Sequence, residues 1–246
     1  MPGSNVRQAD RLRTPAWLAR AGAALIFLTP VGTYAQDRGD LNRLEGEIQS
    51  QRSREAELTR KSEVLAADLA ELRQRAIGAA RSGDIPRARA AVDRLEALRK
   101  AAVDAKLAYW PDPIEIQRRE AAAWLAMAEG RKDEAVALMK DAVALEASIE
   151  KHPVTPGPVL PARELEGDLL MALGRSAEAL AAYEASLAVA PNRYYALGAA
   201  VRAADAAGRG EAARAHFATL AKVAARADGS RVEFAKLKAI AGGAKR

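Results

Sequence analysis

The sequence contains no cysteine and only two histidines, His152 and His216. The absence of cysteine excludes disulfides, thiolate metal sites and cysteine nucleophiles. A zinc site needs three or four ligands at set spacings, and neither histidine has a second histidine near it in the sequence. These absences predict a chain that holds no metal ion.

Motifs that usually identify an enzyme are also missing. The sequence has no phosphate-binding Gly-x-x-x-x-Gly-Lys-Ser/Thr and no Gly-x-Ser-x-Gly. Gly208-Arg-Gly210 begins a match to the dinucleotide-binding fingerprint, but that fingerprint needs a preceding strand, and helical patterns flank it here. Glu164, Glu166 and Asp168 could perform acid–base chemistry, but a solvated or ligand-facing acidic patch is favoured because nothing separates their environments. We therefore expect no enzyme activity and no cofactor.

Aromatic residues make up only 4% of the 246 residues, whereas half of the chain is apolar and alanine is prominent. That apolar fraction is enough for a sizeable core. Small side chains favour closely packed helices over a β-sandwich, which would show alternating β-branched and aromatic residues. The composition predicts an all-α protein.

A glycine followed five residues later by an alanine recurs along the chain. The last two copies are 34 residues apart, whereas the earlier spacings are 44 and 47 residues and require insertions. Repetition at this period is typical of stacked helical hairpins. The four copies begin at Gly83, Gly130, Gly174 and Gly208.

The third copy carries the fullest pattern. Gly167 would allow two helices to approach closely, Gly174 would end the first helix, Ala179 would lie where the helices cross, Tyr183 would fill the core and Pro191 would end the second helix. In these residues the chain resembles a tetratricopeptide repeat, over roughly residues 70 to 225. The resemblance implies an α-solenoid of about four hairpins whose groove is lined by the first helix of each. An alanine-rich helical bundle is the alternative.

The first 35 residues have the pattern of a secretory signal peptide. Arg7, Arg11, Arg13 and Arg20 precede the uncharged apolar run at residues 21–28, and small residues at 33 and 35 suit cleavage after Ala35. The run is too short to span a bilayer comfortably. We expect a periplasmic or secreted protein; an uncleaved anchor and an unstructured basic tail are the alternatives.

Residues 36–80 follow a heptad pattern, with apolar residues such as Leu41, Leu44 and Ile48 spaced as in a coiled coil about 50 Å long. Polar residues interrupt the centre of this seam. A homo-oligomer through this helix is one expectation, and a helix that folds back or caps the repeats is the other.

This segment resembles the N-terminal coil of murein hydrolase activators, and a coil followed by tetratricopeptide repeats behind a signal peptide is similar to periplasmic cell-division coordinators. Both resemblances imply a place in the bacterial cell envelope. Neither one implies a particular partner.

A basic band runs from Arg73 to Lys100, with eight arginines or lysines against three acidic residues. Such a band could attract an anionic polymer or a lipid surface. A solvated helix face is the favoured interpretation, and without interleaved aromatic residues the band does not predict nucleic-acid binding.

Two connections contain several prolines. In Tyr109-Trp-Pro-Asp-Pro113 the aromatic residues either pack over a hairpin or face a ligand, and the segment from Lys151 to Pro161 is expected to be an extended loop over one face or in the groove. These features give a repeat domain at 81–227, followed at 228–246 by a capping helix and a tail.

We predict that the chain is an interaction scaffold that binds a peptide or helix of an envelope protein. The alternative is a structural protein that binds cell-wall or lipid polymers through the coil and the basic band. Register with the tetratricopeptide family predicts the groove residues, which come from the first helices of the second, third and fourth hairpins: Gln117, Glu120, Trp124, Met127, Glu164, Asp168, Met171, Asn192, Arg193, Tyr195 and Arg202. For Trp124 the core and the groove are equally consistent with the sequence.

Overall fold

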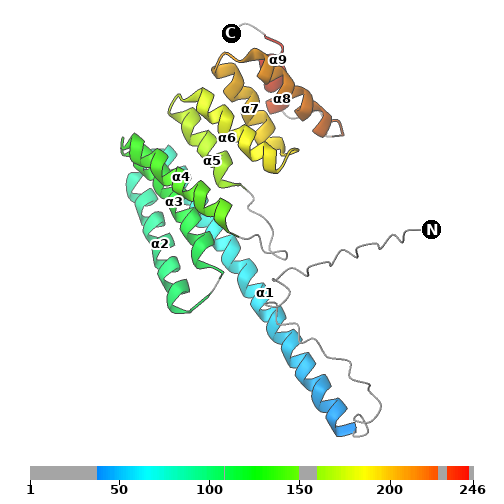
Figure 1. The fold of residues 1–246 in the computed structure, drawn as a ribbon. Coiled ribbons are helices and arrows are strands. Elements are labelled where there is room, and N and C mark those ends of the chain that lie inside the picture. Colours follow the sequence, from blue (N-terminus) through cyan, green and yellow to red (C-terminus); the bar gives the residue numbers. More distant parts are fainter. Residues whose placement is uncertain (1–37, 108, 150–159, 227–231, 244–246) are drawn as a thin grey trace, which may run out of the picture. The chain divides into compact units, whose positions relative to one another are not determined.

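The computed structural model describes residues 38–107, 109–149, 160–226 and 232–243, and these residues form helices and no strand (Figure 1). The prediction of an all-α protein is confirmed. The expected signal peptide and most of the proline-rich loop lie outside the described residues. The helices are α1 (Arg38–Arg81), α2 (Ile85–Asp104), α3 (Pro111–Ala128), α4 (Lys132–Ser148), α5 (Ala162–Ala172), α6 (Ser176–Val189), α7 (Tyr194–Ala206), α8 (Gly210–Val223) and α9 (Val232–Ala241).

Contacts within the chain divide it into two units, Met1–Thr59 and Arg60–Arg246. The division falls inside α1, earlier than the boundary that the heptad pattern placed at residue 80. In the second unit, Leu69, Ala76 and Ile77 of α1 are buried in clusters with side chains of α2 and α3. The end of α1 is therefore the first helix of the first hairpin.

The four predicted glycines each occupy the turn between the two helices of a hairpin. Gly83, Gly130, Gly174 and Gly208 have φ between 71° and 82°, which glycine adopts without strain. In the third turn the Gly174 N–H donates to Met171 O at 3.0 Å and the Arg175 N–H donates to Leu170 O at 2.8 Å. The other three turns repeat both bonds. This pair of bonds satisfies the last carbonyls of the first helix, so each hairpin has the same C-terminal cap.

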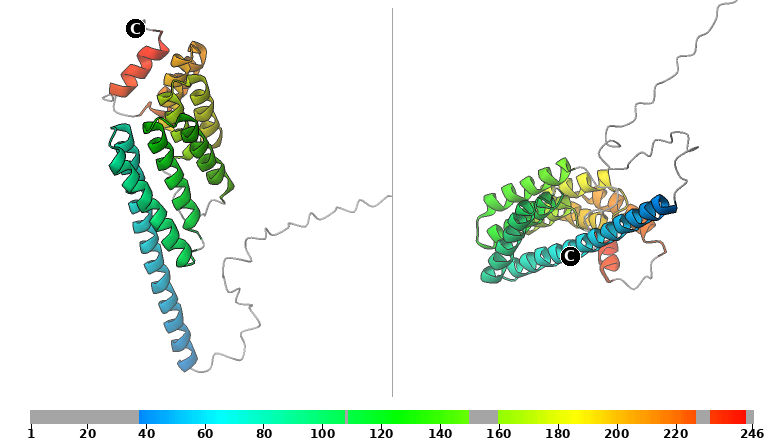
Figure 2. Two further views of the ribbon diagram at one scale, coloured as in Figure 1. Left: turned by 90° about the vertical axis from the view of Figure 1, so that its left-hand side faces the viewer. Right: turned by 90° about the horizontal axis from the view of Figure 1, so that it is seen from below.

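The helices contact their neighbours in sequence: α2 with α3, α3 with α4, α4 with α5, and so on to α8 and α9. The first helices of successive hairpins also contact one another, α3 with α5 and α5 with α7. Figure 2 gives two further views of the ribbon, in which helices that follow one another in the second unit lie side by side. This order of contacts is the one expected for stacked hairpins.

The crossing point of each hairpin is filled as the repeat predicts. The alanines five residues after the turn glycines, Ala88, Ala135, Ala179 and Ala213, are all buried. In the third hairpin a Cβ added to Gly167 would lie 2.8 Å from Cδ1 of Tyr183, and closer still to Cε1. The absence of a side chain at Gly167 is therefore what allows the Tyr183 ring to pack against α5.

Helix α9 packs against both helices of the last hairpin, α7 and α8. Leu237 is buried against α7, where its Cδ1 would lie 3.1 Å from a Cβ added to Gly198. Phe234 of α9 packs on Phe217 of α8, with ring centroids 5.3 Å apart. Among the described residues, none of the helices combines the length and the apolar character needed to cross a membrane.

Candidate functional site

The predicted groove residues lie on or next to α3, α5 and α7, the first helices of three successive hairpins. The α5 and α7 members are brought together: Arg193 contacts Glu164, and Tyr195 contacts Asp168. The α3 members have their polar contacts with α1 instead, through the ion pair of Arg73 with Glu120. The candidate site is therefore concentrated on α5 and α7.

Three of the predicted residues lie in the core and not on a surface. Glu120 and Glu164 are 0% exposed and Trp124 is 2% exposed. Trp124 packs among the side chains of α1, α3, α4 and α5, and the Arg81 guanidinium lies 5.1 Å from its ring centroid. These positions correct the expectation that a partner contacts these side chains directly, because they face the neighbouring helices of their own chain.

Glu120 forms a buried ion pair that joins the first two hairpins. Arg73 Nη1 of α1 donates to Glu120 Oε2 at 2.9 Å and to the carbonyl oxygen of Leu160 at 3.3 Å. Arg73 Nε, Glu120 Oε1, Gln117 Oε1 and Trp124 Nε1 are buried and have no hydrogen-bond partner among the described residues. Burial raises the pKa of Glu120 to about 7, although the charge of Arg73 opposes that shift. This pair is a structural contact with an incomplete set of hydrogen bonds.

The carboxylate of Glu164 has more hydrogen bonds than that of Glu120. Arg193 donates to both carboxylate oxygens, with Nη2 at 3.0 Å from Oε2 and Nε on Oε1, and Ser186 Oγ donates to Oε1 at 3.3 Å. A two-pronged contact of this kind fixes the guanidinium plane. Glu164 thus positions Arg193, which precedes α7 and is partly exposed.

Asp168 accepts two tyrosine hydroxyls, Tyr183 OH at 2.7 Å and Tyr195 OH at 2.6 Å. Burial raises the pKa of both tyrosines well above the usual value for tyrosine, and the negative charge of Asp168 is the second cause of this shift. Both phenols therefore remain protonated donors at neutral pH. Tyr183 lies in the core, whereas Tyr195 is 42% exposed.

Exposed surface in the predicted set is found mainly on and beside α7. Asn192 and Tyr195 are exposed, and Arg202 pairs with Glu233 of α9 through an Nη1 to Oε1 distance of 2.6 Å. Gln117, Met127, Met171 and Arg193 are half-buried. A hollow on the described surface lies elsewhere, between α1 and α2, and is lined by Asp68, Glu71, Leu72, Arg75, Arg94 and Leu98.

Nothing in the described residues adds a catalytic or metal arrangement. No group of three or more histidine or acidic side chains is placed to hold a metal ion in those residues. His216 Nε2 of α8 lies 3.1 Å from Glu184 Oε1 of α6, and His152 lies outside the described residues. Of the acidic trio, Glu164 and Asp168 are bound by the contacts above, and burial raises the pKa of Glu166. The absence of a cofactor stays a prediction.

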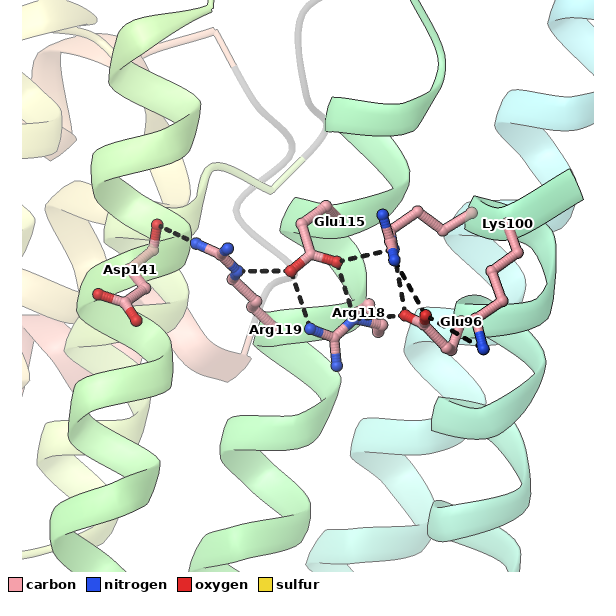
Figure 3. Close-up of polar contacts among 7 residues, drawn as sticks. Glu96, Lys100, Glu115, Arg118, Arg119 and Asp141 are labelled. Carbon is pink, nitrogen blue, oxygen red and sulfur yellow. Dashed lines mark hydrogen bonds and ion pairs between the residues drawn. The ribbon is translucent and has the colours of Figure 1, made fainter. Parts of the chain in front are cut away.

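Charged side chains on α2 and α3 form a network that the basic band did not predict (Figure 3). Glu115 accepts Arg118 Nε at 2.8 Å and Arg119 Nε at 2.7 Å, and lies 3.5 Å from Arg99 Nε. Glu96 accepts two bonds from Arg99 and lies 3.2 Å from Arg118 Nε and 3.9 Å from Lys100 Nζ.

Two carboxylates therefore hold four basic side chains in this network. Burial would raise the pKa of Glu115, but the hydrogen bonds from Arg118 and Arg119 outweigh it and leave the pKa lowered. The pKa of Glu96 is lowered mainly by its hydrogen bonds from Arg99. Arg119 Nη1 also reaches the carbonyl oxygen of Asp141 on α4, at 3.4 Å.

These contacts neutralise much of the basic band. Arg73, Arg75, Arg89, Arg99 and Lys100 are each paired with a glutamate. The pairs with Glu71, Glu96 and Glu115 could be predicted only in part from the sequence. The spacing of Glu115, Arg118 and Arg119 on one helix indicates pairing. Contacts between helices do not follow from spacing.

Comparison with known proteins gives no matching family model, and no curated protein matches the chain either.

Proposed function

We propose that the chain is a non-enzymatic scaffold of the bacterial cell envelope that binds a peptide or helix of a partner protein. The partner would lie on the surface formed by α5 and α7, with the half-buried Met127 of α3 at its edge. The observation that supports this proposal is that the first helices of successive hairpins contact one another while Asn192 and Tyr195 are exposed and Arg202 is half-buried, on or beside α7. An export signal at residues 1–35 and self-association through α1 belong to the same proposal.

The chemistry of this surface fits a partner with both polar and apolar groups. Arg193 is held in one orientation by Glu164, and the Tyr195 hydroxyl is held by Asp168, so both side chains are ordered before binding. Preorganised side chains lose little rotational freedom on association. Arginine and tyrosine are also the residue types that dominate binding energy at protein interfaces.

The alternative function, polymer binding through the basic band, has less support. Five of the eight basic residues of the band are paired with glutamates, so fewer charges are available to an anionic polymer. Such binding would also weaken steeply between low and physiological salt, whereas a contact with a large apolar share would not.

A pulldown from solubilised envelope tests the proposal, with the full chain as bait beside the double variant Asn192→Ala/Arg202→Ala. Arg214→Ala is the matched control, because Arg214 is an exposed arginine on α8, the second helix of the same hairpin. We expect partners that the control retains and the double variant loses, since truncating a side chain that carries binding energy costs about 1 kcal/mol or more. Equal capture by the double variant and the control would contradict the assignment of this surface.

A further inference from the structure

The first part of α1 carries an apolar stripe that its own chain does not cover. Residues 41–57 are all exposed, and Leu41, Leu44 and Ile48 are between 46% and 51% exposed. Most of the stability of a helix in a protein comes from packing of its apolar face and not from the helix propensity of its residues. The stripe therefore needs an occupant, and the charges that flank it indicate which one.

The four charged residues at the heptad positions that flank the stripe are divided by sign along the helix. Glu45 and Glu47 precede Gln51, and Arg52 and Arg54 follow it. These four residues lie at the positions that flank a heptad seam, where contacts between helices select partner and orientation. None of the four has an ion pair or hydrogen bond among the described residues. Four exposed charges thus remain for a second helix.

We propose that a second copy of this chain binds this stripe with its helix antiparallel. In the proposed antiparallel pair, Ile48 lies opposite Gln51 of the second copy and Leu44 lies opposite Glu55 of the second copy. The Glu55 carboxylate reaches water while its methylene groups cover Leu44. Because the pair is symmetric, each of these layers occurs twice.

The same register pairs the charges. Flanking positions of one type meet their own type across an antiparallel helix pair, so Glu45 meets Arg52 of the second copy and Glu47 meets Arg54 of the second copy. Symmetry doubles both contacts, and all four unpaired charges of each copy gain a partner of opposite sign. A single charge pattern that matches itself when reversed is evidence for an isologous interface.

A parallel pair and shifted antiparallel registers pair the charges of the two helices less well. In a parallel pair the apolar layers at Leu44 and Ile48 would form, but Glu55 would face Glu55 of the other copy at the centre, and Glu45 and Arg54 would lose their partners. Shifting the antiparallel register by one heptad brings Arg52 against Arg52, or Glu45 against Glu45, depending on direction. Like charges placed opposite each other disfavour each of these alternatives.

This inference rests on the proposed self-association through α1, and cysteine cross-linking of the full chain tests it. The native sequence has no cysteine, so any disulfide arises from introduced residues. We expect Leu44→Cys and Glu55→Cys chains to form a disulfide-linked dimer when mixed, because these positions face each other in the antiparallel pair. A disulfide dimer of Leu44→Cys with itself would overturn the antiparallel arrangement, since positions 44 of the two copies would be separated by about 16 Å.

Charge reversal gives an independent test by analytical ultracentrifugation. Glu45→Arg/Glu47→Arg and Arg52→Glu/Arg54→Glu should each weaken the dimer by about tenfold or more, because four attractive pairs become repulsive. An equimolar mixture of the two variants should regain the affinity of the wild-type dimer, since every pair is again of opposite sign. Failure of the mixture to recover would overturn the charge pairing.

The outcomes separate this inference from the proposed function. A wild-type chain that sediments as a monomer at all concentrations would overturn both the antiparallel dimer and self-association. An oligomer that cross-links only in the parallel manner would overturn the inference alone. Neither result bears on the α5 and α7 surface, which the Arg202 and Arg214 variants test.

Discussion

The second and third hairpins, α3 with α4 and α5 with α6, have the same plan and differ in how they fill it. Each buries a glutamate ten residues before its turn glycine, Glu120 in the second hairpin and Glu164 in the third. Both carboxylates are 0% exposed, but Glu164 has hydrogen bonds to both oxygens, whereas Glu120 has a bond to one. The position in the repeat determines that the glutamate is buried. The neighbouring elements determine how many hydrogen bonds its carboxylate receives.

A second difference concerns the crossing of the two helices. The third hairpin combines Gly167 with the Tyr183 ring, and the equivalent positions of the second hairpin, 44 residues earlier, are Ala123 and Met139. All four positions are buried. A larger residue on the first helix is thus matched by a flexible, unbranched one on the second. A hairpin can hold either pair at this crossing because the two residues of each pair have about the same summed volume.

The largest predicted effect comes from removing the partner of the less satisfied glutamate. Arg73→Met leaves Glu120 buried without a counter-charge and should lower the free energy of unfolding by about 3 to 5 kcal/mol at pH 8. Urea unfolding measures this change. The double variant Arg73→Met/Glu120→Gln is the control and should recover part of the loss, because it removes the buried charge as well. A loss within about 0.5 kcal/mol for the single variant would show that the pair is not buried in solution.

The dependence of stability on pH is the next largest effect. The pKa of Glu120 is about 7 in the folded state against an ordinary value of 4.5, so the folded state holds a proton that the unfolded chain has released between these values. The free energy of unfolding should therefore fall by at most about 3 kcal/mol as pH rises from about 4.5 to about 7. Above pH 7 the contribution of Glu120 should no longer change with pH.

Glu120→Gln should remove most of that decline in thermal unfolding measured across the same pH range. Glu166→Gln is the matched control on the third hairpin, because burial also raises the pKa of this half-buried residue and the nearby Arg163 and Lys140 oppose the shift. We expect it to remove a smaller part. An undiminished decline in Glu120→Gln would assign the pH dependence to other groups.

The smallest of these effects probes the helix crossing. Gly167→Ala places a methyl group against the Tyr183 ring and should destabilise the chain by about 1 to 3 kcal/mol. Adding Tyr183→Met reproduces the pair found in the second hairpin and should restore part of the loss, as measured by chemical denaturation. Gly78→Ala is the control, since no atom lies within 4 Å of the added Cβ on α1. If the effects of Gly167→Ala and Tyr183→Met on the free energy of unfolding simply added in the double variant, the volume argument would be contradicted.

The turns of the fold could be predicted from the sequence because their requirement is local. A residue at φ above 70° at the end of a helix calls for glycine, so Gly83, Gly130, Gly174 and Gly208 marked all four hairpins. The boundary inside α1 could not be predicted, because Leu69 and Ala76 continue the same heptad as Leu41 although they pack within their own chain. A heptad pattern does not distinguish a partner in the same chain from one in another chain.

The candidate site was harder to predict than the fold. Register placed the predicted groove residues on or next to α3, α5 and α7, but it could not identify Glu120 and Glu164 as core residues, because their partners Arg73 and Arg193 come from other elements. Trp124 was left open between core and groove for the same reason, since the stacking partner Arg81 is on α1. Only residues whose partners lie one helical turn away, such as Glu115 and Arg118, could be paired from the sequence.

The identical turns have a consequence for how such a chain can change over generations. Each turn is closed by bonds between a glycine, its next residue and the helix just before them, so it uses no atom from another hairpin. Spacing between turns nevertheless varies from 34 to 47 residues. The extra residues lie in longer helices as well as in connections, since α2 and α3 have 20 and 18 residues whereas α6 and α7 have 14 and 13. Changes in length therefore fall outside the turns, and a lineage could gain or lose a whole hairpin, or lengthen a helix or a connecting loop, without redesigning the turns.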